Sequence, residues 1–148
     1  MAHKFIEHLK KDHDKQRKLG EQLRNAKDPE RRKELRKKMH EELYPHIQGE
    51  EASIFDYMQE AGGKAREEAM KALQEHHVDE VLLRELMDLT LDGETFSAKA
   101  YVLDEINRHH IEEEEKTHFP MLVKMVSEEK LDELYKAYEE AEKKAKSE

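Results

Sequence analysis

Apolar residues recur every three or four positions along nearly the whole chain, and this spacing predicts amphipathic helices. Asp28-Pro29 separates the first helical segment from the second, because proline suits the first turn of a helix. Ala61-Gly62-Gly63 and Leu91-Asp92-Gly93 mark two later breaks. The four segments between these breaks are expected at about 2–27, 30–60, 64–90 and from 94 to at least 118.

Three further residues affect the ends and the straightness of the predicted helices. Pro45 lies inside the second segment, and Pro120 is expected to kink or interrupt the fourth. Ser127 can cap one more helix, about 128–146, which has its own apolar stripe. The pattern therefore predicts an all-α fold: an up-down-up-down four-helix bundle (1–126) with an additional C-terminal helix (127–148) packed on the bundle. The alternative for that last helix is a frayed tail.

Each of the four long segments has a histidine in the row of side chains that faces inward. These are His13, His46, His76 and His110. Rows through the neighbouring His77 and His109 are the alternatives for the third and fourth segments, but both rows run into charged side chains. We therefore assign His76 and His110, not their neighbours, to the core.

Two glutamates share a helix face with two of these histidines. Glu50 follows His46 by four positions and Glu114 follows His110 by four, which places each carboxylate beside an imidazole. At a rise of about 1.5 Å per residue, counting from the turns puts all six side chains at nearly one level of the bundle. The inward rows contain no Lys or Arg, and unpaired buried carboxylates are costly, so the sequence predicts a metal site.

Composition narrows the chemistry of such a site. The 148-residue chain has ten histidines and no cysteine, so a metal would take nitrogen and oxygen ligands. A formal net charge of −9 argues against a nucleic-acid partner. We see no signal peptide and no apolar run near the ~20 residues that cross a bilayer. We therefore expect no membrane partner, a cytoplasmic location, and a monomer or weak homo-oligomer.

Four imidazoles and two carboxylates suit two ions, each held by two histidines, with both glutamates bridging. This donor set favours iron, with manganese or zinc as alternatives. Two Fe³⁺ ions would bring six positive charges to two carboxylates, so an oxo or hydroxo bridge is expected; Fe²⁺ is the reduced form. Open ligand positions would be where O2, peroxide or NO binds.

Two parts of the chain are copies of each other. Residues 46–55 align without a gap on residues 110–119, and both contain His, Glu at +4, a second Glu and Phe at +9. Asp12-His13 and Glu75-His76, each followed by spaced leucines, begin two further motifs. Together these motifs, over residues about 1–126, resemble the hemerythrin-like (HHE cation-binding) family.

The resemblance implies a non-haem di-iron centre that binds O2 or related ligands for carriage, sensing, peroxide breakdown or NO handling. It implies that the iron ligands are His13, His46, Glu50, His76, His110 and Glu114. Oxygen-carrying hemerythrin has a second histidine four residues after the one on its third helix, where this chain has Glu80. One imidazole fewer implies a more open or carboxylate-richer site.

Four other residues are candidates for roles near the metals. Glu80 could be a third carboxylate ligand or a hydrogen-bond acceptor for a ligand imidazole. His118 could supply a proton or a further ligand, or lie at the core edge bonded to a carbonyl. Tyr44 and Tyr101 could hydrogen-bond to bound oxygen, or pack with their hydroxyls in water.

Four hypotheses for function follow. The first is a di-iron protein that binds O2, peroxide or NO, and the second is a redox enzyme that decomposes peroxide or reduces NO; no catalytic residue is singled out for it. The third is a ferritin-like di-iron oxidase or iron store, which needs Glu-x-x-His on two helices, whereas this chain has the motif once, at Glu115–His118. The fourth is a purely structural bundle.

Overall fold

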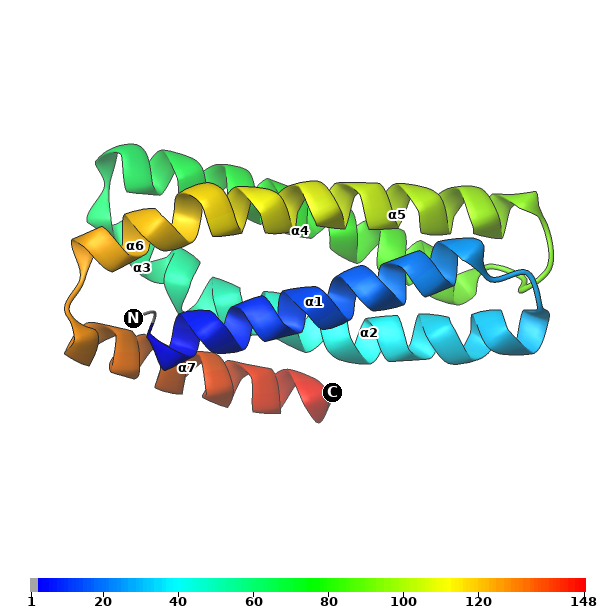
Figure 1. Cartoon of the computed structure of the whole chain (residues 1–148), viewed down its shortest axis with the longest axis horizontal. Coiled ribbons are helices and arrows are strands. Elements are labelled where there is room, and N and C mark those ends of the chain that lie inside the picture. The colour runs from blue at the N-terminus through cyan, green and yellow to red at the C-terminus, as the bar shows by residue number, and fades with distance from the viewer. Residues whose placement is uncertain (1–2) are drawn as a thin grey trace.

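Long helices dominate the structure, a computed structural model that describes residues 3–148 (Figure 1). These residues contain no strand, which confirms the all-helical prediction. The elements in chain order are α1 (Lys4–Asn25), α2 (Pro29–Ala52), α3 (Ile54–Ala61), α4 (Gly63–Asp88), α5 (Glu94–Glu113), the π-helical turn η1 (Glu114–His118), α6 (Phe119–Met125) and α7 (Glu128–Lys146).

The helix ends follow from local capping. Asp28 accepts a hydrogen bond from the backbone N–H of Arg31, and Pro29 occupies the first turn of α2. His3 caps α1 by accepting from the N–H of Phe5, so α1 begins at Lys4; Ala2, where we expected the helix to begin, lies outside the described residues. Gly62 adopts a φ of 74° at the α3–α4 junction, which allows the sharp reversal there.

The second predicted helix, 30–60, is divided in two at Ser53. Pro45 stays inside α2 without ending it. The Ser53 hydroxyl instead donates to the carbonyl oxygen of Gly49, 2.7 Å away, and the Ser53 backbone has φ −124° and ψ −85°. A serine that bonds back to the preceding turn bends a helix, and here α3 begins after the bend.

The fourth predicted helix is interrupted before Pro120 by a π-helical turn. Regular α-helix ends at Glu113, and the next turn is π-helical, with the Phe119 N–H bonded to the Glu114 carbonyl five residues earlier. Proline has no N–H to continue the regular pattern, and the wider turn before it takes up the mismatch. Glu114, one of the six predicted ligands, is the first residue of this turn.

Figure 1 shows α1, α2, α4 and α5 lying along the long axis, with the α1–α2 and α4–α5 connections at the same end. α1 contacts both α2 and α5, and α4 contacts α5. α7 packs along α2, and Leu131, Leu134 and Tyr138 of α7 are buried. Within residues 3–148, no helix has the length and apolar character that membrane crossing would require.

Two apolar clusters fill the core and leave a polar layer between them. One cluster joins α1, α3, α4, α6 and α7 and includes Phe5, Phe55 and Phe119. The other joins α1, α2, α4 and α5 toward the two connections and includes Leu35 and Phe96. The predicted ligands lie in the layer between the two.

Candidate metal centre

Six buried side chains from α1, α2, α4, α5 and the start of η1 meet in this layer. Their relative exposure is at most 3%. They are His13, His46, Glu50, His76, His110 and Glu114. The structure therefore brings together the six residues that the sequence predicts as ligands.

The two carboxylates lie between pairs of imidazoles. Glu50 directs one oxygen to Nε2 of His46 and the other to Nε2 of His76, both at 3.3 Å. Glu114 directs one oxygen to Nε2 of His13, at 3.0 Å, and the other to Nε2 of His110, at 3.2 Å.

These atoms form two groups that share both carboxylates. One group contains His13 and His46, and the other contains His76 and His110. Within each group the ligand atoms lie within 4.8 Å of one another. Each group has a size and composition that could hold one metal ion, with Glu50 and Glu114 common to both.

Every imidazole is fixed from behind by a carboxylate on another helix. Nδ1 of His13 bonds to Glu115 at 2.8 Å, and Nδ1 of His76 bonds to Glu51 at 2.9 Å. The other two pairs, His46 with Asp12 and His110 with Glu75, have bonds of 3.0 Å. Because an ionised carboxylate only accepts, each Nδ1 is the donor, and in the neutral ring the Nε2 lone pair then faces inward as metal coordination requires.

The inward-facing atoms have no hydrogen bonds in the described part of the chain. The four Nε2 atoms and all four oxygens of Glu50 and Glu114 are buried without such a partner. The Nε2–oxygen pairs lie 3.0–3.3 Å apart, but they do not form hydrogen bonds. Donor atoms that converge without bonding to each other fit a common third partner, so the residues present fit metal ions.

The pKa shifts in the metal-free protein also indicate that this layer needs positive charge. Burial by itself would lower the pKa of His46 and of His110, but the facing Glu50 and Glu114 carboxylates and the hydrogen bonds to Asp12 and Glu75 raise both well above the usual value. Burial would raise the pKa of Glu114, but His110 and His13 hold it well below its usual value. Without a metal, protons on the imidazoles supply the positive charge that these carboxylates need.

The alternative histidines point away from the centre. His77 is exposed. The side chain of His109 is 67% exposed and lies 3.8 Å from Glu75. The sequence assignment of His76 and His110 to the core therefore agrees with their burial.

The structure places the four additional candidates outside the two groups. Glu80 is half-buried and accepts a hydrogen bond from Gln48. His118 is buried with its Nε2 3.4 Å from Glu68, and its ring centroid is 6.5 Å from that of His110. The Tyr44 hydroxyl donates to Glu148, and Tyr101 is 48% exposed beneath the guanidinium of Arg24.

Two buried residues near the centre were not anticipated. Asp79 is fully buried one turn after His76, and neither of its oxygens has a hydrogen-bond partner in residues 3–148. Burial raises its pKa to about 7 although His110 and His76 lower it. Tyr138 of α7 is also fully buried, and its hydroxyl donates to Asp12 at 3.0 Å. The spacing of three from His76 is a signal that could have identified Asp79.

Comparison with known families agrees with this geometry. Residues 4–122 match the family model described as the hemerythrin HHE cation binding domain. The match spans most of the chain, and the protein belongs to that family. No curated protein and no solved structure matches the chain significantly.

Proposed function

We propose that this protein holds two iron ions in its core and binds O2, peroxide or NO there. His13 and His46 would hold one ion, His76 and His110 the other, and Glu50 and Glu114 both. The observation that carries the proposal is the set of eight buried inward-facing donor atoms, none of which has a hydrogen-bond partner within residues 3–148. Imidazole and carboxylate without sulfur favour iron over softer-ligand metals.

The arrangement we propose around the ions is an up-down-up-down bundle of α1, α2, α4 and α5, with residues 1–126 as the metal-binding domain and 127–148 as the added helix. When bound, the pair of iron ions, with an oxo or hydroxo bridge, supplies redox chemistry and open coordination positions. With these six side chains as the protein ligands, the open coordination positions would accept a small diatomic molecule or peroxide, as the family resemblance implies.

The surrounding residues orient the ligands and exclude water. The Phe55 ring meets His76 edge-on with centroids 5.5 Å apart, and the Phe119 ring stacks on His13 at 5.7 Å. Both phenylalanines are buried and place apolar surface against these two ligands. Asp79 lies one turn after His76, and its raised pKa lets it keep a proton near neutral pH. We assign to Asp79 the role of proton store for reactions of the bound ligand.

The ferritin-like alternative has less support. Its Glu-x-x-His motif would need Glu115 and His118 at one metal, but Glu115 bonds to His13 and Arg17 while His118 faces Glu68.

Metal analysis with spectroscopy tests the proposal. Protein freed of metal and then given Fe²⁺ in air should retain about two irons per chain and absorb in the near ultraviolet. Glu50→Gln should lower the iron content, whereas Glu60→Gln, at an exposed position of α3, should not. A colourless protein that retains no iron would reject the proposal.

A further inference from the structure

The C-terminal helix reaches the metal centre through one side chain. Tyr138 of α7 is fully buried, and its ring lies 5.9 Å from the ring of His46, centroid to centroid. The family match ends at residue 122, so α7 lies beyond it. Nothing in the family resemblance accounts for a tyrosine at this place.

The Tyr138 hydroxyl bonds to the carboxylate that orients His46. It donates to Oδ2 of Asp12 at 3.0 Å, and the same oxygen accepts from Nδ1 of His46 at 3.0 Å. The hydroxyl is also 3.1 Å from Nδ1 of His46 and 3.2 Å from Oε2 of Glu142. Tyr138, Asp12 and His46 therefore form one compact hydrogen-bonded group behind a single metal ligand.

The carboxylate partners of the other three ligand histidines are less buried than Asp12. The side chains of their carboxylate partners, Glu51, Glu75 and Glu115, are 25–31% exposed. The side chain of Asp12 is 8% exposed. A buried carboxylate needs more than one donor to be satisfied, and the tyrosine hydroxyl supplies the second. Glu115 also has a second donor, the guanidinium of Arg17 at 2.9 Å, but Asp12 is the partner carboxylate that is itself buried.

The α2 backbone is shaped to admit this tyrosine. A Cβ added at Gly49 would lie 2.6 Å from two atoms of the Tyr138 ring, so only glycine lets α7 approach so closely. Gly49 follows His46 by three positions; in the second copy of the repeat, the residue three after His110 is Glu113. The two copies therefore differ at the position where Tyr138 packs.

We propose that Tyr138 is a positioning residue for the metal centre: seated against Gly49, it holds Asp12 on His46 and so strengthens the binding of one of the two ions, the one shared by His13 and His46. The inference rests on the proposed function, because it assumes that two ions are bound. The Tyr138 contact would make the two ions bind with unequal affinity, and it would give the C-terminal helix a part in metal binding.

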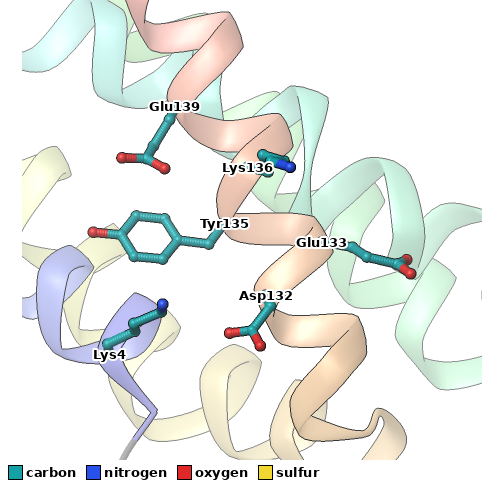
Figure 2. Close-up of a pocket in the computed structure, with 6 residues that line it drawn as sticks. All are labelled: Lys4, Asp132, Glu133, Tyr135, Lys136 and Glu139. Carbon is teal, nitrogen blue, oxygen red and sulfur yellow. The ribbon is translucent and has the colours of Figure 1, made fainter.

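The test is stepwise binding of Zn²⁺, a redox-silent probe, in competition with a chromophoric chelator. Tyr138→Phe should weaken one of the two binding steps about 10-fold, as loss of a partner behind a metal ligand does, and leave the other unchanged. Tyr135→Phe is the matched control. Tyr135 is on the same helix but lines a surface hollow with Lys4 and Glu139, as Figure 2 shows. It should leave both steps unchanged.

A second variant, on α2, perturbs the same hydrogen-bonded group of Tyr138, Asp12 and His46. Gly49→Ala keeps the hydroxyl but moves the Tyr138 ring, so it should weaken the same step. Combined with Tyr138→Phe, it should weaken that step by much less than the product of the two separate effects, because both act through one contact.

Thermal unfolding of the metal-free variants measures any purely structural effect of each substitution, whereas the difference between the two zinc-binding steps is a readout that a merely structural role would not move. Tyr138→Phe should lower one zinc affinity and leave the other unchanged, whatever its effect on the melting temperature. This inference alone would be overturned if wild-type protein binds two zinc ions and Tyr138→Phe weakens both steps equally or neither. Wild-type protein that binds neither zinc nor iron would overturn the proposed function as well.

Discussion

Asp79 offers a quantitative test of the electrostatics beside the centre. Burial raises its pKa to about 7 from the usual 3.8, despite His110 and His76 nearby. Because the folded-state pKa is raised, the folded protein binds the proton more tightly, and stability is lost as pH rises from about 4 through 7. The shift of about three units corresponds to at most about 4 kcal/mol above pH 7, at roughly 1.4 kcal/mol per unit.

Asp79→Asn removes the ionisation and nearly keeps the shape of the side chain. The metal-free variant should be more stable than metal-free wild type, by roughly 2 kcal/mol at pH 5 and about 4 kcal/mol at pH 8 as upper bounds. Against a typical total stability of about 5–15 kcal/mol, such a change is easily measured.

Urea unfolding of both proteins at several pH values between 5 and 8 gives the difference. Asp92→Asn, at an exposed position, is the control and should show no pH-dependent gain. The decisive quantity is the change with pH of the difference between Asp79→Asn and wild type. A difference that is constant, or that shrinks as pH rises, would refute the reasoning, because Asp79 would then be ionised and stabilised in the folded protein.

Three further predictions follow from the same structure. His76→Ala should lower the iron content to about one ion per chain or less, because His76 serves one group only, while His77→Ala at the exposed neighbour should keep about two by metal analysis. Iron at about 100 times its dissociation constant should stabilise the protein by about 2.7 kcal/mol for each bound ion in thermal unfolding, and a chelator should reverse this; an unchanged melting temperature would contradict it. Ser127→Ala should destabilise the protein by about 1 kcal/mol in urea unfolding, because the Ser127 hydroxyl caps α7 by accepting from Lys130; no loss would mean that the cap contributes nothing.

Helical periodicity was enough to predict the four long helical segments and to assign the ligand histidines to their inward faces. The rows through His77 and His109 would have buried charged residues, so hydrophobic patterning alone selected His76 and His110. The bend at Ser53 was not predictable in this way. It depends on a hydroxyl that bonds to a particular carbonyl, a choice that propensity does not decide.

The carboxylates behind the histidines were only partly foreseeable. Asp12 and Glu75 each precede a ligand histidine, and Glu51 and Glu115 each follow a ligand glutamate. This regularity marks them as belonging to the site. Which acid bonds to which histidine depends on how the helices pair, and every one of these bonds joins two helices.

Asp79 and Tyr138 show two different limits of sequence reasoning. Asp79 and Glu80 lie three and four positions after His76, and a small rotation of α4 decides which of them faces the core. Only Glu80 was a candidate from the sequence, and it is half-buried and accepts a hydrogen bond from Gln48. Tyr138 was visible only as part of an apolar stripe, because its role depends on where α7 packs.

The central claim is that two metal ions lie between four imidazoles and two shared carboxylates. Diffraction from crystals of iron-loaded protein, measured at the iron absorption edge, locates the ions directly. The account predicts two anomalous peaks, one between His13 and His46 and one between His76 and His110, each beside Glu50 and Glu114. No peak in this layer, or iron bound only at the surface, would contradict it.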